Sequence, residues 1–88
     1  MSEHHDEQNR HGVVTDYSPP QKRATVQLSG NVGEGDRVHI IGPRTNLEET
    51  VTKLEVNGST AAAGAPGDVV SFPVRSMVRA GDALHREL

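Results

Sequence analysis

The sequence predicts an all-β fold, a small six-stranded barrel that is closed or nearly closed. Three observations lead to this prediction: Val supplies 11 of the apolar side chains against five Leu and two Ile, apolar and polar residues alternate in short runs, and Gly or Pro separates these runs. A branched Cβ loses little freedom in a strand, and a period of two marks a strand that is buried on one face. Closure would remove open sheet edges, which invite pairing with other chains.

The first two predicted strands form a hairpin. Residues 12–17 are a β-rich run that ends at Pro19-Pro20, and residues 24–28 alternate cleanly. Proline stops a helix and favours a turn, so the connection between the strands is a loop. That loop carries Lys22 and Arg23. The inward side chains of the second strand are expected to be Ala24, Val26 and Leu28.

The middle of the chain is predicted as a loop, a strand and a second loop. Residues 31–36 are rich in Gly, residues 37–42 alternate with Val38 and Ile40 inward, and residues 43–49 are mostly polar and charged. The acidic pair within the second loop, Glu48-Glu49, is interpreted as solvated loop charge. Alternation with a period of two supports only the central run as a strand.

Residues 50–60 are predicted as a strand with an irregularity. Val51 and Leu54 are out of strict alternation, which suggests a bulge near Thr52 and Lys53 that would bend the strand. Asn57-Gly58 predicts a tight turn because both residues tolerate positive φ.

The last two strands are predicted over residues 69–74 and 82–88. Val70, Phe72 and Val74 alternate inward in the first of them, and Pro73 removes a backbone donor, which marks an edge or a bulge. In the second, apolar and charged residues alternate in a way that does not decide which side chains face inward.

Gly-Asp occurs three times, each time before a short apolar run. The pairs are Gly35-Asp36, Gly67-Asp68 and Gly81-Asp82. Gly can adopt the positive φ of a turn, and Asp can accept a hydrogen bond from a nearby backbone N–H. We therefore interpret the pairs as turns that lead into strands, and a catalytic or metal-binding set of aspartates is the alternative.

The N-terminal residues 1–11 are expected to be a disordered tail, and residues 12–88 the barrel domain. After Met1 the tail has no apolar residue that could offset the entropy of ordering. We interpret the histidines and acids of the tail as solvated side chains, and a weak metal site is the alternative. These residues are His4, His5, His11, Glu3, Asp6 and Glu7. No secretory signal and no run of roughly 20 apolar residues is present, so we expect a cytoplasmic protein without membrane contact.

This chain lacks the residues that several kinds of site require. There is no Cys for a disulfide or a thiolate zinc site and no G-x-x-x-x-G-K-[ST] loop for a nucleotide. No Ser lies in a G-x-S-x-G context, and His39 and His85 fall on predicted strands, where a His is usually a surface residue. We expect no enzymatic activity, no cofactor and no resident metal.

Residues 12–88 resemble a known family of barrels. From Val32 to Leu88 the chain looks like the second domain of elongation factor Tu. It is also similar to short translation elongation factor-like proteins and to the C-terminal barrel of collagenase-like peptidase family proteins involved in RNA modification. The residues that carry the resemblance are Gly35-Asp36 with Val38 and Gly42, Thr50-Val51 with Leu54-Glu55, Pro66-Gly67-Asp68 with Val70, and Arg79 with Gly81-Asp82 and Leu84.

The resemblance implies a non-catalytic binding module, an RNA- or ribosome-associated adaptor. A local basic patch could hold tRNA or rRNA through phosphate contacts, although residues 12–88 carry nine acids and eight bases and are nearly neutral. The alternative is a protein-docking module or a free-standing subunit that binds a peptidase-like or translation protein. The candidate binding residues are Lys22, Arg23, Arg44, Arg75, Arg79 and Arg86.

Overall fold

The computed structural model describes residues 10–87, which form ten β-strands and no helix. No helix in this part of the chain could therefore cross a membrane. The all-β prediction is confirmed. The strands are β1 (Arg10–Ser18), β2 (Arg23–Leu28), β3 (Val32–Gly33), β4 (Arg37–Gly42), β5 (Thr45–Thr50), β6 (Glu55–Val56), β7 (Ser59–Thr60), β8 (Ala63–Gly64), β9 (Val69–Pro73) and β10 (Ala83–Arg86).

The first strand begins earlier than the sequence suggested. β1 starts at Arg10, two residues before the predicted domain boundary at Gly12, and the N–H groups of Ser29 and Gly30 both donate to the carbonyl of His11. Arg10 and His11 therefore belong to the folded domain. The remainder of the predicted tail, residues 1–9, lies outside the described residues.

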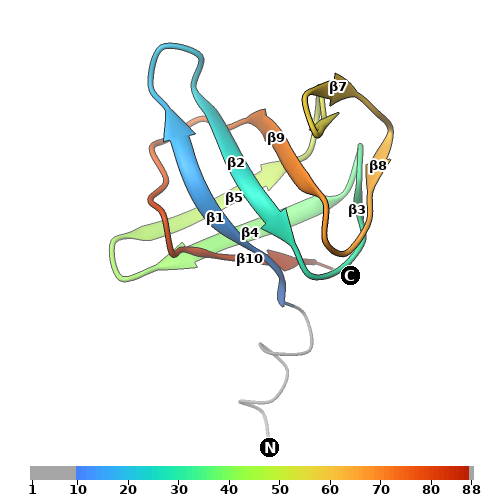
Figure 1. The fold of residues 1–88 in the computed structure, drawn as a ribbon. Coiled ribbons are helices and arrows are strands. Elements are labelled where there is room, and N and C mark those ends of the chain that lie inside the picture. Colours follow the sequence, from blue (N-terminus) through green and yellow to red (C-terminus); the bar gives the residue numbers. More distant parts are fainter. Residues whose placement is uncertain (1–9, 88) are drawn as a thin grey trace, which may run out of the picture.

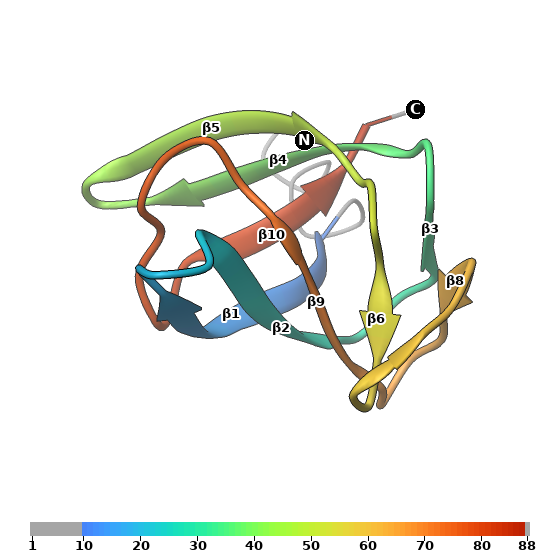
Figure 2. The same ribbon diagram turned by 90° about the horizontal axis from the view of Figure 1, so that it is seen from above.

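Eight strands form one antiparallel sheet in the order β5-β4-β10-β1-β2-β9-β6-β7. The sheet is strongly curled, so that β4 and β5 lie across the interior from β1, β2 and β9 (Figures 1 and 2). β5 and β7 nevertheless remain its two end strands. The sequence predicted a six-stranded barrel, closed or nearly closed, whereas the structure has a curled sheet of eight strands that does not close.

A second sheet of two strands, β3 and β8, lies beside the larger one. Val32 pairs with Gly64, and past these strand ends Glu34 N–H donates to the carbonyl of Ala62 at 2.9 Å. Gly35 N–H donates to the carbonyl of Val51, just after β5, at the same distance. The segment predicted as a plain loop over residues 31–36 thus contains a short strand. Its Val32 is buried, so this strand also completes the core.

The interior consists of small branched side chains around one aromatic ring. Phe72, Ile40, Leu54 and Leu84 are the largest side chains with no exposed surface. The alternation in β2, β4 and β9 is confirmed, because every residue predicted to face inward there is buried. These residues are Ala24, Val26, Leu28, Val38, Ile40, Val70, Phe72 and Val74.

Residues 43–49 were predicted as a loop, and this prediction is wrong. They contain a tight turn and most of β5, which pairs with β4 from Gly42↔Thr45 to Arg37↔Thr50. The charged side chains of this strand made its sequence resemble a loop, because a strand at the end of a sheet can expose such side chains on its outer face.

The strand predicted over residues 50–60 is divided into three parts. β5 ends at Thr50, the chain turns at Lys53 with φ 49°, and β6 and β7 follow as a hairpin. The irregularity is at the expected place but is a break, not a bulge, since β5 is at one end of the sheet order and β6 is next to the strand at the other end. The hairpin turn has φ 52° at Asn57 and 90° at Gly58, the signs that a type I′ turn requires.

Candidate functional site

Three turns of the same geometry position the loops of this domain. In each, the glycine of a Gly-Asp pair has a φ between 90° and 96°. The Asp N–H donates to the carbonyl three residues earlier at 3.0–3.1 Å. The Asp Oδ2 accepts the N–H of that same earlier residue at 2.8–2.9 Å. Positive φ at the third position is typical of a type II turn. The earlier residues are Gly33, Ala65 and Arg79.

The third turn closes the segment that joins β9 to β10, residues 74–82. Val74 and Val78 anchor this segment in the core, with 5% and 0% of their surface exposed. Met77, between these anchors, is 56% exposed, the largest value among the exposed large hydrophobic residues of the described chain. The segment thus presents an apolar side chain to solvent from a fixed backbone.

Glu49 holds the start of this segment. Its Oε2 accepts the backbone N–H of Arg75 at 2.6 Å and the Nε–H of the same residue at 3.1 Å, and Arg75 Nη2 donates to the carbonyl of Glu48. Glu49 is only 9% exposed. The interpretation of Glu48-Glu49 as solvated loop charge is therefore wrong for Glu49, which is a buried anchor on β5.

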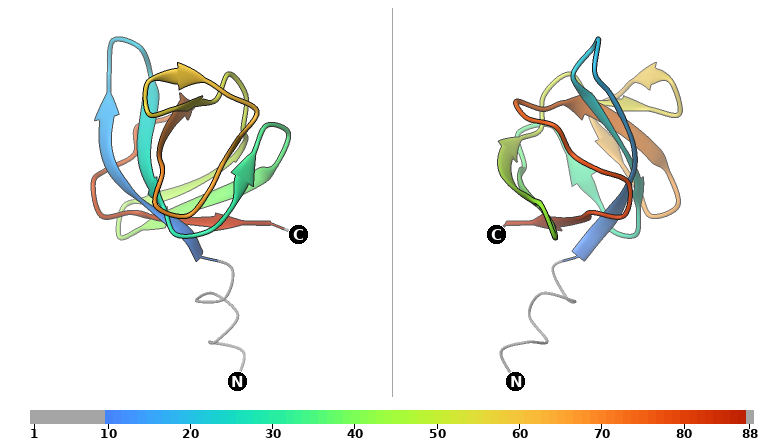
Figure 3. Two further views of the ribbon diagram at one scale, coloured as in Figure 1. Left: turned by 45° about the vertical axis from the view of Figure 1, so that its right-hand side comes forward. Right: turned by 90° about the vertical axis from the view of Figure 1, so that its left-hand side faces the viewer.

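Arg79 is held at the other end of the segment. Its Nη1 donates to the carbonyl of Arg44 at 3.3 Å and lies 3.4 Å from the Thr45 hydroxyl. Lys22 also reaches this end of the molecule, since its carbonyl accepts the N–H of Val74 at 2.8 Å. The β1–β2 loop, the β4–β5 turn and the segment 74–82 are all seen from this end in the right-hand view of Figure 3.

Four of the six predicted binding residues are therefore gathered at one end, together with a methionine. All five residues are exposed. We call this group the Met77 surface, and it consists of Met77, Arg75, Arg79, Arg44 and Lys22. Exposed cations and one flexible apolar side chain on three neighbouring loops suit contact with a macromolecule more than chemistry on a small substrate.

The other two predicted binding residues have contacts elsewhere. Arg23 donates to the carbonyls of Lys53 and Ser71 at 2.8 and 3.0 Å, which ties the break after β5 to β9. Arg86 lies 3.2 Å from the carboxylate of Asp36. Because β10 runs away from segment 74–82 to the opposite end of the molecule (Figure 1), Arg86 is not part of the Met77 surface.

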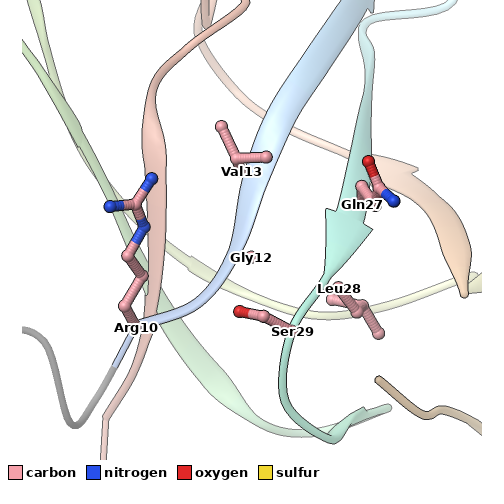
Figure 4. A pocket seen from close by; sticks show the side chains of 6 residues that line it. All are labelled: Arg10, Gly12, Val13, Gln27, Leu28 and Ser29. Atoms are coloured by element: carbon pink, nitrogen blue, oxygen red, sulfur yellow. The ribbon is translucent and has the colours of Figure 1, made fainter. Parts of the chain in front are cut away.

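A shallow hollow of about 320 Å³ lies beside Gly12 at the ends of β1 and β2. Figure 4 shows Arg10, Val13, Gln27 and Ser29 around it. A Cβ at Gly12 would lie 2.8 Å from the carbonyl oxygen of Gln27, so the glycine allows the two strands to approach. The lining offers one cation and no acid–base pair, which makes it a weak candidate for a site.

Met77 and the role of Glu49 were not recognised in the sequence. Met77 stands between two arginines and two valines, and it breaks the apolar alternation of the preceding strand. That break was the available signal for an exposed apolar side chain. Nothing in the local sequence indicates that Glu49 meets Arg75, because the two residues are 26 positions apart.

Comparison with solved structures gives a clear similarity. The chain matches the crystal structure of the C-terminal domain of a Geobacillus thermoleovorans putative U32 peptidase with a TM-score of 0.85 and 26% identity, over 92% of this chain and 94% of that one. The selenomethionine variant of the same domain matches with a TM-score of 0.82 and 26% identity, over 86% and 96% of the two chains. No family model and no curated protein matches the chain. The similarity supports the peptidase half of the expected resemblance, and neither matched structure is a translation factor.

Proposed function

We propose that this chain is a non-catalytic binding domain that docks onto a peptidase-like catalytic region through the Met77 surface. The observation that carries the proposal is the similarity to a C-terminal domain of a putative peptidase along nearly the whole chain. In that protein, a domain of this fold is the C-terminal domain of a putative peptidase. Docking to a peptidase-like protein was the alternative function expected from the sequence, and it now has more support than the adaptor for RNA or the ribosome.

The chemistry of the Met77 surface suits a protein partner. Methionine is flexible and polarizable, so it can fill an irregular apolar pocket, and arginine is enriched in protein interfaces. The bonds that Arg75 and Arg79 make to Glu49 and to the Arg44 carbonyl hold both side chains before binding. Pre-ordering lowers the entropic cost of association. The expected partner surface is an apolar pocket with an acidic rim.

Titration of the isotope-labelled chain with the catalytic region of a U32-type peptidase tests this proposal. Resonances of segment 74–82 and of the β4–β5 turn should shift, and Met77→Ser should weaken binding at least tenfold, as expected for an interface anchor. The matched control is Val69→Ser, which removes another exposed apolar side chain, 42% exposed, from the start of β9, away from segment 74–82. The control should leave affinity within twofold.

A titration with tRNA at low and moderate salt distinguishes docking to a peptidase-like protein from binding to RNA. If the catalytic region does not bind, while tRNA shifts Arg75 and Arg79 with an affinity that falls steeply with salt, the docking proposal is overturned in favour of RNA contact. If Met77→Ser and Val69→Ser weaken peptidase binding equally, the Met77 surface is not the interface.

A further inference from the structure

A row of polar side chains crosses the outer face of β5, β4 and β10 in a single register. His39 of β4 pairs with Glu48 of β5 on one side and with His85 of β10 on the other. Residues directly opposite in an antiparallel pair project from the same face with their Cβ atoms about 4.5–5.5 Å apart. Glu87 continues this face, because it lies two residues after His85 and its N–H donates to the carbonyl of Arg37.

The side chains of His39, Glu48 and Glu87 come close together. One ligand atom from each lies within 4.8 Å of the other two, and this is the one such group of three or more among residues 10–87. Ligands of a tetrahedral zinc ion, bound at about 2.0–2.2 Å, are about 3.3 Å apart. Glu48 has a half-exposed side chain and Glu87 is exposed, so rotation of the two carboxylates can close the remaining distance.

A neighbouring amide orients the imidazole. Nε2 of His39 is in hydrogen-bond contact with Oδ1 of Asn46, two residues before Glu48 on the same face of β5. An amide oxygen only accepts hydrogen bonds, so with the Asn46 amide in this orientation the ring proton is on Nε2 and the lone pair of Nδ1 is free. Metal-binding histidines have the same arrangement, in which the second ring nitrogen donates to an oxygen.

We propose that His39, Glu48 and Glu87 form a binding site for Zn²⁺. One imidazole with two carboxylates suits this ion, whereas Ca²⁺ and Mg²⁺ prefer oxygen ligands alone. Arg37 lies 3.2 Å from Oε1 of Glu48, so the second oxygen of Glu48 is the expected ligand and the nearby cation limits the affinity. Three protein ligands leave the fourth position to water.

A bound ion would link three neighbouring segments at the β5 edge of the sheet. The three ligands come from the end strand β5, from β4 and from the residue after β10. An ion that binds only the folded state stabilises it in proportion to the logarithm of its concentration over the dissociation constant. Stability thus provides a readout that does not depend on any activity of the chain.

The test uses Zn²⁺ itself and the 88-residue chain with His4→Ala and His5→Ala, because tail histidines could bind the ion separately. Resonances of His39, Glu48 and Glu87 should shift with one-to-one stoichiometry, and the thermal midpoint should rise. His39→Thr and Glu87→Gln should each weaken binding at least tenfold. Glu55→Gln is the control, since Glu55 lies on β6 beside Arg23 and outside the group.

Two results would overturn the proposal. One is a dissociation constant that His39→Thr changes by less than twofold while the variant keeps its dispersed amide spectrum. The other is equal binding of Mg²⁺, which would indicate attraction to surface carboxylates alone.

Discussion

Replacing Asp82 with Ala should destabilise the domain more than the same replacement of Asp68. Both carboxylates accept one backbone N–H at 2.9 Å in turns of the same geometry. They differ in burial, since Asp82 is 2% exposed whereas Asp68 is partly exposed and its hydrogen bond is open to water. A typical hydrogen bond contributes about 0.5–1.5 kcal/mol to stability, and one to a charged group contributes about 1.5–3 kcal/mol. We expect the buried Asp82 to follow the higher range, and the exposed bond of Asp68 to lie low in the typical range because water can replace it.

Urea denaturation followed by far-ultraviolet circular dichroism measures this difference. With a slope of about 1 kcal/mol per molar urea for a small domain, Asp82→Ala should lower the midpoint by about 2 M and Asp68→Ala by less than about 1 M. Asp82→Asn, which keeps an oxygen acceptor, should fall between Asp82→Ala and the unchanged chain. Equal midpoints for the two alanine variants would refute the argument that burial sets the strength of these turns.

Two kinds of glycine substitution test different physical causes. Gly67→Val or Gly81→Val should cost about 1–3 kcal/mol in a denaturant melt, because the φ values are 92° and 96° while a Cβ at either position would meet no atom within 4 Å. Neutral results would contradict the turn assignment. Gly42→Ala should lower the free energy of unfolding by about 1–3 kcal/mol through crowding, since its Cβ would lie 1.9 Å from Asp82 Oδ1. If the loss at Gly42 comes from this contact, Gly42→Ala should cost little further stability in a chain that already carries Asp82→Ala.

Much of the core could be predicted from local pattern. Val26, Ile40 and Phe72 belong to runs that alternate with a period of two, and each is buried as that period requires. The strands that were missed are two residues long or lie at the end of the sheet, as β3 and β5 do. Such strands depend on a partner from elsewhere in the chain, and a local window carries little signal for them.

The Met77 surface could be predicted only in part from the sequence. The arginines of segment 74–82 could be selected from the sequence because basic residues near a strand end suggest a partner. That Arg86 points to the other end of the molecule follows from the direction of β10, which local pattern does not give. The exposure of Met77 depends on the burial of its neighbours Val74 and Val78.

The sequence by itself determined the class of the fold and the place of its turns, because strand periodicity and the positive φ of glycine are properties of a few adjacent residues. Tertiary structure alone decided that the sheet remains open, that Glu49 is buried against Arg75, and that His39 meets Glu48 and Glu87. Each of these depends on register between strands that are distant in the chain, and register is set by how the whole core packs.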